Sequence, residues 1–383
     1  MTTDIPPLPS DPLAEELREF AIRYHLAERY RALDRAPAFP WAEYRAMGTD
    51  RWLGLHFSER VGGRGLPLPR IGRLLYLLGY WGGTTFAKIA LQPEFCSVLS
   101  EQGSPELREA YFLPVMQGKV LVGNHITEPE AGSDLSRVTT VARREGEEYV
   151  LDGTKSEAVF VKDASAAIVY AFVQPTTDPK PSLTAFLVPQ DRPGIHAEIV
   201  ADLGEKWMRR GFVRYEHVRL PASYRIGEEG RALAYLLPEL ARERGLLAMI
   251  YLGVARASWE ETVAHVGQRI VFDRPLSTHE AVAFPLARDW ADLESTRLFA
   301  ESALVALEEG RPAVKETALA KAIATEVALR TLDHSIQFHG GAGYSAQFGH
   351  EQRWRDVRSG TLAHGSTELL YQVAARQFWH KKS

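Results

Sequence analysis

Two short segments of the chain carry residue types that could bind a ligand. The segment 126–134, Ile-Thr-Glu-Pro-Glu-Ala-Gly-Ser-Asp, offers hydroxyls and backbone N–H groups that could hold an anion or a carbonyl oxygen. A capped turn in front of a strand would use the same residues. In the second segment, Gly340, Gly341 and Gly343 would let the backbone approach a ligand closely. These glycines follow a helix-like stretch, so they do not match the strand–turn–helix fingerprint of dinucleotide-binding folds.

Residue counts and spacing argue against several other kinds of site. Cys96 is the single cysteine, so the chain can form no intrachain disulfide and no cysteine-only zinc or iron–sulfur site. His334 and His339 are five residues apart, which takes them off one helical face, and we expect no metal site there. The 45 Lys and Arg residues stand against 49 Asp and Glu residues, a balance that disfavours a general nucleic-acid binder.

The elements that must position these segments fall into three parts. Apolar residues recur at helical spacing over 11–32, which predicts one amphipathic helix at the start of the first part. From 120 to 221 the apolar residues form short runs separated by turn signals, which favours an antiparallel barrel or sandwich. Long helical periodicity returns from residue 232 onward and is clearest over 313–338. We place the domain boundaries at 1–119, 120–228 and 229–383.

Length and hydropathy indicate a soluble protein. A chain of 383 residues can form two or three domains with a large hydrophobic core. Residues 1–10 lack the basic and apolar regions of a signal peptide. No stretch approaches the roughly 20 apolar residues that cross a bilayer. We therefore expect a cytoplasmic protein without membrane association.

The segment 126–134 closely resembles the signature of the acyl-CoA dehydrogenase family, a group of flavoproteins. The resemblance extends along nearly the whole chain. The further segments that resemble the family pattern are 59–65, 151–155, 218–221, 226–230, 269–276, 337–344, 355–356 and 365–368. Several matches in the family's order and at family-like spacing are far more specific than any one of them. The chain is therefore identified as a member of this superfamily.

The resemblance implies an α+β fold with an N-terminal helical domain, a central antiparallel β-domain and a C-terminal four-helix bundle. In the family, FAD lies between the β-domain and the bundle, and a neighbouring subunit completes its site. The implied reaction is the α,β-dehydrogenation of an acyl thioester, in which a base removes a proton and the flavin receives a hydride. The implied partners are an acyl group on coenzyme A or on an acyl carrier protein, an electron-transfer partner, and further copies of the chain in a homodimer or homotetramer.

The family's functional positions can be carried over residue by residue. The positions implied for the cofactor are Thr127, Gly132, Ser133, Ser366 and Glu368 near the flavin ring and reacting end, and Arg269, Phe272, Gln337, Gly340 and Gly341 from the neighbouring subunit. Ser133 and Arg244 would also contact the acyl thioester. A guanidinium such as Arg269 suits a pyrophosphate because its contacts are charge-assisted and often bidentate. Without the family pattern, the same arginine would be read as a surface charge.

Two residues are candidates for the base that takes the substrate proton. Most family members have a Glu directly before the Gly of a Gly-Thr segment, and His364 stands at that position here. Some members supply the Glu from an earlier bundle helix, just before an Arg, and Glu243-Arg244 falls at that place. A buried Glu243 would have a raised pKa, and a neutral His364 could also accept a proton. The alternatives are a surface Glu243 paired with Arg242 or Arg244, and an inert His364 that fills space.

A second departure from the family pattern lies after the Gly-Thr-Lys turn. Glu157, Ala158 and Val159 stand where family members usually have Trp-Ile-Thr. The change removes an aromatic stacking surface and a hydrogen bond of about 1 kcal/mol at the flavin ring, so FAD could bind differently, bind weakly or be absent. The same fold could then carry out an elimination, a cyclisation or a flavin-dependent oxygenation, or the chain could be a non-catalytic homologue.

Overall fold

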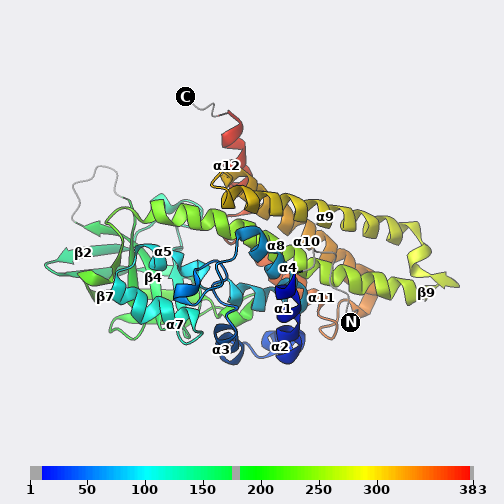
Figure 1. Cartoon of the computed structure of the whole chain (residues 1–383), viewed down its shortest axis with the longest axis horizontal. Helices are drawn as coiled ribbons and strands as arrows, with labels where there is room; N and C mark the ends of the chain where they lie inside the picture. Colours follow the sequence, from blue (N-terminus) through cyan, green and yellow to red (C-terminus); the bar gives the residue numbers. More distant parts are fainter. Residues whose placement is uncertain (1–10, 175–181, 380–383) are drawn as a thin grey trace.

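The computed structural model describes residues 11–174 and 182–379. In Figure 1 a β-domain forms one end of the elongated molecule, and long helices run from it to the other end. The N-terminal helices pack against the middle of these long helices. The order of helices, strands and helices is the predicted one, and the α+β fold class is confirmed.

The N-terminal part is helical, but its first helix differs from the prediction. Its helices are α1 (Pro12–Arg23), α2 (Leu26–Arg35), α3 (Trp41–Thr49), α4 (Leu68–Ala90), α5 (Ser97–Gln102), α6 (Pro105–Leu107) and α7 (Leu113–Met116). The prediction of one helix over 11–32 is wrong, because α1 ends at Arg23 and His25 adopts a left-handed φ of 49°. Apolar spacing continues through this break, since both helices bury their apolar faces in the same core.

The strands of the β-domain form one eight-stranded sheet. They are β1 (Val122–His125), β2 (Val141–Glu145), β3 (Glu148–Ala158), β4 (Ala166–Gln174), β5 (Thr184–Pro189), β6 (Ile195–Ile199), β7 (Gly211–Pro221) and β8 (Arg225–Ile226). The order is β6-β7-β3-β2-β4-β5-β8, and β1 also pairs with β4. The prediction of a purely antiparallel domain is wrong in one respect, because β1 and β2 both pair with β4 in parallel. β1 pairs with the first half of β4 and β2 with its end, so the two strands follow one another along β4 and leave the connecting segment 126–140 beside the sheet.

Long helices form the C-terminal part. They are α8 (Ala232–Gln268), α9 (Glu280–Glu308), α10 (Val314–His339), α11 (His350–Arg358) and α12 (Thr367–Trp379), with a two-stranded hairpin of β9 (Ile270–Val271) and β10 (Arg274–Pro275) between α8 and α9. α8 packs against α4, α9 and α10, and its stretch 243–258 is almost wholly buried. α12 projects from the body of the molecule (Figure 1). Among the described helices, none is both long and apolar enough to cross a membrane.

α4 is bent at Gly83, where φ is 67° and ψ is −168°. A Cβ atom at this position would lie 2.5 Å from the ring of Tyr30, so the close packing of α2 against α4 requires glycine here. Beyond the bend, the last turn of α4 carries the buried Lys88, whose ammonium lies 5.3 Å from the centre of the Tyr251 ring on α8. The bend therefore helps to set a positive charge inside the helical core.

Candidate active site

Glu243 is buried in the middle of α8 and is not a surface residue. It is 2% exposed, and its Oε2 lies 3.2 Å from Nε2 of His364. Its carboxyl group is also hydrogen-bonded to that of Glu239, one turn earlier on α8. Burial raises the pKa of Glu243 to about 8, although the charges of Arg242 and Arg244 act in the opposite direction. The carboxylate thus has the basicity that a proton acceptor needs near neutral pH.

His364 is held in an unusual backbone conformation between α11 and α12. Its φ is 56°, a left-handed value that non-glycine residues adopt infrequently and often at functional sites. Burial, together with the positive charges of Lys88 and Lys321, lowers its pKa to about 3. The imidazole is therefore neutral near pH 7 and a far weaker base than Glu243. It contacts Glu243 through Nε2, so it is placed to orient that carboxylate.

Two buried cations hold the loop that carries His364. The Nε of Arg244 donates a hydrogen bond of 2.9 Å to the carbonyl oxygen of His364, and Nζ of Lys321 donates one of 2.8 Å to that of Gly365. Burial, followed by the charges of Arg244 and Lys88, lowers the pKa of Lys321 to about 7. Arg244, expected at the substrate, thus supports the loop beside the candidate base.

A buried ion pair lies behind this loop and was not predicted. The ammonium of Lys88 pairs with the carboxylate of Glu205, and the two side chains are 3% and 5% exposed. Glu205 also accepts a hydrogen bond from the hydroxyl of Ser359, in the turn before His364. The available signal is a lysine inside an apolar helical run, as in Phe-Ala-Lys-Ile-Ala at 86–90 and Leu-Ala-Lys-Ala-Ile at 319–323. A charge in such a run is either strongly paired or functional.

The segment 126–134 is fixed to the sheet by Glu128, which the sequence analysis also missed. Glu128 Oε1 accepts a hydrogen bond of 2.9 Å from Nζ of Lys155 on β3. Both oxygens of Glu128 also accept from the backbone N–H and hydroxyl groups of Thr139 and Thr140. Burial by itself would raise the pKa of Glu128, but the Thr140 hydrogen bond and the charge of Lys155 outweigh it and hold the pKa at about 2. The carboxylate is therefore ionised over the whole physiological range.

Three predicted cofactor positions lie on this anchored segment. Thr127 is partly buried, and its carbonyl oxygen accepts a hydrogen bond of 2.9 Å from the N–H of Ser156. Gly132 and Ser133 are exposed, and a Cβ added at Gly132 would meet no atom within 4 Å. Asn124, three residues before Thr127, donates to the carbonyl oxygen of Phe95 at 3.4 Å, and the rings of Phe95 and His364 are 5.5 Å apart. The segment therefore starts close to the candidate base.

Five other predicted positions lie far from Glu243 in the same copy of the chain. They are Arg269, Phe272, Gln337, Gly340 and Gly341, and all five are exposed. The rings of His265 and His339 are 4.2 Å apart, which places the ends of α8 and α10 together. A rise of 1.5 Å per residue sets Arg269 about 39 Å from Glu243 along α8. One protomer thus presents two separate groups of predicted site residues.

Ser366 and Glu368 lie at the start of α12, next to the loop that carries His364. The Ser366 hydroxyl accepts a hydrogen bond of 3.2 Å from the N–H of Leu369, so it caps the helix. Glu368 is exposed, and hydrogen bonds from its own backbone N–H and from Ser366 lower its pKa. Both residues therefore serve the helix end that follows the candidate base.

Glu157, which stands where family members usually have an aromatic residue at the flavin ring, points into solvent. Its side chain is 57% exposed, and Oε2 accepts a hydrogen bond of 2.8 Å from Arg210. Behind it, the carbonyl oxygen of Val159 lies 3.3 Å from Nε2 of the buried His125, whose Nδ1 contacts the Tyr215 hydroxyl at 2.8 Å. Where an aromatic surface was expected, this chain has an exposed ion pair above a buried polar pair.

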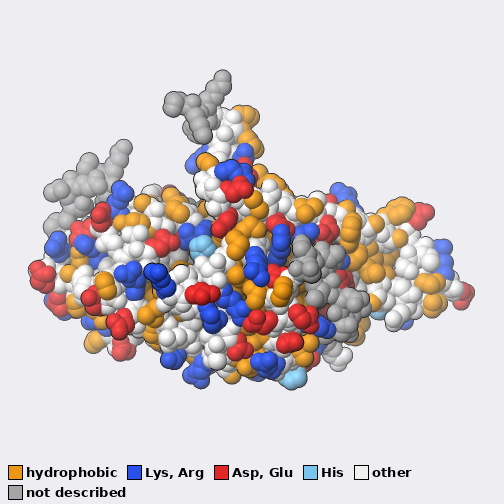
Figure 2. Space-filling model, in the orientation of Figure 1, with side chains coloured by type: hydrophobic (Ala, Val, Ile, Leu, Met, Phe, Trp, Pro, Cys, Tyr) orange, Lys and Arg blue, Asp and Glu red, His pale blue; other side chains and the backbone are white. Residues whose placement is uncertain are grey.

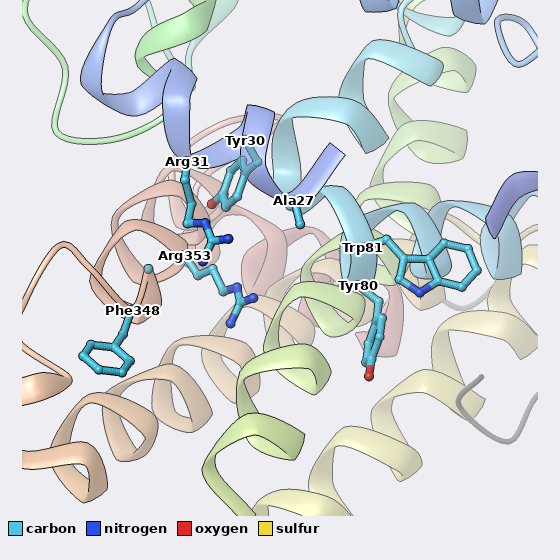
Figure 3. Close-up of a pocket in the computed structure, with 9 residues that line it drawn as sticks. Ala27, Tyr30, Arg31, Tyr80, Trp81, Phe348 and Arg353 are labelled. Carbon is cyan, nitrogen blue, oxygen red and sulfur yellow. The ribbon is translucent and has the colours of Figure 1, made fainter. Parts of the chain in front are cut away.

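A small cavity lies elsewhere in the helical part, between α2, α4 and the segment before α11. Figure 3 shows Arg31 and Arg353 pointing toward it from facing elements, with Tyr30 beside them. Its volume is about 20 Å³, close to that of one water molecule. It is too small for an organic substrate and is separate from Glu243.

The comparisons with known proteins agree with this geometry. The N-terminal, middle and C-terminal domain models of the acyl-CoA dehydrogenase family match residues 11–119, 123–218 and 230–378. Benzylmalonyl-CoA dehydrogenase of Aromatoleum aromaticum is 30% identical over 358 residues, which cover 92% of this chain and 93% of that protein.

Solved structures share the fold over nearly the whole chain. An acyl-CoA dehydrogenase from Geobacillus kaustophilus has a TM-score of 0.90 at 24% identity and covers 97% of this chain and 99% of its own. The prolyl acyl carrier protein oxidase AnaB has a TM-score of 0.88 at 23% identity and covers 97% of this chain and 100% of its own. The three domains and the full-length relative together show that the chain belongs to the acyl-CoA dehydrogenase family and is an FAD-dependent oxidoreductase that acts on CH–CH bonds.

Proposed function

We propose that this enzyme introduces a double bond between the α and β carbons of an acyl thioester, with Glu243 as the base. The observation that carries the proposal is the buried Glu243, whose pKa is raised to about 8 and whose Oε2 faces His364 at 3.2 Å. An ionised carboxylate of this basicity can accept the α proton if the substrate lies against it. When bound, FAD accepts the hydride that leaves the β carbon, so the thioester loses one proton and one hydride.

The other side chains near Glu243 position it. His364 occupies the family's usual base position, and we propose that its neutral imidazole orients Glu243 instead of accepting the proton. Arg244 and Lys321 hold the two carbonyl groups of this loop, which supports a positioning role for both. Ser133, on the segment anchored by Glu128, is proposed to contact the flavin and the thioester.

The residues present fit FAD, and they fit it best between two copies of the chain. Gly132, Gly340 and Gly341 stand in open space, where a cofactor can approach the backbone. Arg269 and Phe272 are exposed but lie about 39 Å or more from Glu243. We propose a homodimer or homotetramer in which one copy holds the flavin ring and another holds the pyrophosphate and adenine.

Exposed hydrophobic side chains support this assembly. Ile270, Phe272 and Phe284 are 56%, 86% and 65% exposed near the far end of α8 and the start of α9. Figure 2 shows hydrophobic side chains gathered over this end of the molecule. Apolar surface of this kind marks protein interaction sites.

We also propose the boundaries 1–119, 120–228 and 229–383 for the three domains. The acyl group would be carried by coenzyme A or by an acyl carrier protein. An electron-transfer partner would reoxidise the flavin.

The flavin spectrum tests the proposed function. Purified protein, supplied with FAD, is expected to be yellow and to lose its flavin absorbance when an acyl thioester is added without oxygen. Mass spectrometry should find a 2-enoyl thioester lighter by one H₂. Failure to take up FAD, or conversion of the thioester with the flavin still oxidised, would contradict the proposal and would favour an elimination or a cyclisation.

The pH dependence of the reaction identifies the base. Glu243 must be ionised to accept a proton, and burial raises its pKa to about 8. We therefore expect kcat/KM for a neutral acyl thioester to rise about tenfold per pH unit below this pKa and to level off above it. His364, with a pKa of about 3, does not titrate in this range. A profile that is flat from pH 6 to pH 9, measured by flavin reduction, would argue against Glu243.

A further inference from the structure

Glu205 lies at a junction of all three parts of the chain. It stands between β6 and β7 of the β-domain, and its side chain is 5% exposed. Its carboxylate pairs with the ammonium of Lys88 on α4 and accepts a hydrogen bond from the hydroxyl of Ser359, which follows α11. Its backbone N–H donates a hydrogen bond of 2.6 Å to Oδ1 of Asp356 on α11. One residue of the β-domain thus contacts both helical parts.

Close backbone contacts fix the segments that carry these groups. A Cβ atom at Gly204 would lie 2.5 Å from the backbone of α11, so this segment lies directly against that helix. A Cβ atom at Gly360 would lie 2.7 Å from side chains of α8 and α10, so the turn 359–361 lies directly against both. Glu205 has a left-handed φ of 49°, which a non-glycine residue keeps only where its surroundings hold it. The two segments that meet here therefore have little freedom to move.

The turn that Glu205 contacts leads directly to His364. The carbonyl oxygen of Ser359 accepts a hydrogen bond of 3.0 Å from the N–H of Ala363, the residue before His364. The other end of the loop is held separately, by the two buried cations on α8 and α10. A shift of Ser359 would therefore displace the imidazole that contacts Glu243.

Stability alone does not account for an ion pair at this place. Taking two charges out of water is costly, and apolar side chains of similar volume often stabilise a fold as well as a buried pair does. Apolar side chains, however, cannot accept a hydrogen bond at one defined point. Lys88 contacts Oε1 of Glu205 and Ser359 contacts Oε2, so the ammonium sets the orientation in which the carboxylate meets the hydroxyl.

We propose that Glu205 and Lys88 are positioning residues for the reaction, which hold the turn 359–361 so that His364 stays against Glu243. This inference rests on the proposed function, because it takes Glu243 as the base. The alternative is an ion pair that only keeps the three domains together and has no effect on the base.

The contact would also keep the two sides of the reacting centre in register. The β-domain carries the segment 126–134 beside its sheet, whereas the base lies on α8 of the helical bundle. Glu205 belongs to the first of these parts and holds a turn of the second. The flavin-binding segment and the base are thereby tied to one another away from the substrate.

Ser359→Ala tests the contact because it removes the hydroxyl and leaves the ion pair in place. With FAD-loaded protein, we expect the limiting rate of flavin reduction by an acyl-CoA to fall about tenfold. The half-saturating acyl-CoA concentration and the Kd for FAD should change less than about twofold. Ser359→Thr keeps a hydroxyl and should restore the rate. An unchanged rate, or a variant that instead loses FAD or its folded structure, would overturn the inference.

The pH profile separates positioning from a general loss of structure. The neutral imidazole of His364 can donate to Glu243, which favours the ionised carboxylate. A displaced imidazole no longer does so, and the pKa in the kcat/KM profile of Ser359→Ala should rise by about half a pH unit or more. The variant keeps every other group whose charge acts here: Lys88, Lys321, Arg244 and Glu205 at His364, and Arg242, Arg244, Glu239 and Glu94 at Glu243. A lower rate with an unshifted profile would contradict the positioning role.

A double-mutant cycle ties the effect to the ion pair. Lys88→Met combined with Glu205→Met removes the pair without leaving a buried charge behind. We expect this variant to show the same losses as Ser359→Ala, and the combination of all three changes to add nothing further, because they act through one contact. Additive losses would overturn the assignment.

Lys206→Gln is the matched control. Lys206 is the next residue along the chain, and its ammonium bridges to Asp34 on α2 at 3.0 Å. It therefore joins two domains without contacting the turn 359–361. The rate and the pH profile should stay unchanged, and a loss equal to that of Ser359→Ala would show that bridging the domains is the whole effect.

Solid-state NMR of ¹⁵N-histidine-labelled protein reads the position of His364 without turnover. His364→Gln assigns its signal. We expect one neutral tautomer, protonated at Nε2, in the wild type and in Lys206→Gln, and a mixture of tautomers in Ser359→Ala. Flavin reduction with neither a rate change nor a tautomer change in Ser359→Ala keeps the proposed function and rejects this inference. A tautomer change in a protein whose flavin no acyl-CoA reduces rejects the proposed function and keeps the link from Glu205 to His364.

Discussion

Replacing Glu243 with Gln is expected to lower the rate of flavin reduction by an acyl thioester roughly 10³-fold, within the range that a positioned general base contributes. The amide has nearly the same shape as the carboxylate but cannot accept the α proton. Since Glu243 is buried and its pKa is raised, the neutral amide should not destabilise the fold. FAD should therefore remain bound, and anaerobic stopped-flow absorbance with the FAD-loaded variant measures the loss.

His364→Gln is the informative comparison. A glutamine amide can still donate a hydrogen bond toward Glu243, so we expect a loss of about tenfold and a pH profile that keeps its rise toward pH 8. The opposite ranking, with an active Glu243→Gln variant and an inactive His364→Gln variant, would assign the base to the imidazole.

The second large effect is expected at Glu128. Glu128→Leu leaves the ammonium of Lys155 buried without its carboxylate and removes the acceptor for Thr139 and Thr140. Breaking a buried ion pair in this way destabilises a protein by about 3–5 kcal/mol. We expect that decrease in the free energy of unfolding, measured by urea denaturation, together with weaker FAD binding because the segment 126–134 loses its anchor.

Two further variants check this interpretation. Glu130 lies on the same segment, but its side chain is 80% exposed, so Glu130→Ala should change the free energy of unfolding by less than about 0.5 kcal/mol. Adding Lys155→Met to Glu128→Leu removes the uncompensated charge and should restore a large part of the lost stability. A decrease below about 1 kcal/mol for Glu128→Leu alone would show that the anchor is unimportant.

The order of helices and strands could be predicted because hydrophobic periodicity is a local property. The break at His25 and the parallel pairing of β1 and β2 with β4 could not. Two helices that face the same core keep one apolar spacing through the break, so the pattern does not record it. Alternation within a strand likewise says which face is buried, but it does not give the direction of the neighbouring strand.

The site was predicted in part, and the limit has a similar cause. Glu243 could be singled out because a short motif marks it, but its burial depends on packing against α4 and on a loop more than 100 residues later. Lys88 and Glu128 were missed because each acts through partners that only the fold brings near. A charged residue in an otherwise apolar stretch was the one signal available for Lys88.

Because α8 is long, we expect flavin binding to depend on the protein concentration. The helix separates the reacting end from Arg269 by about 39 Å, so a lone copy can supply only half of the proposed flavin site. Occupancy by the flavin would then follow mass action between protein molecules as well as the amount of free FAD. Strong dilution would bleach the colour of the preparation while every helix remains folded, and concentrating the sample with added FAD would bring the colour back.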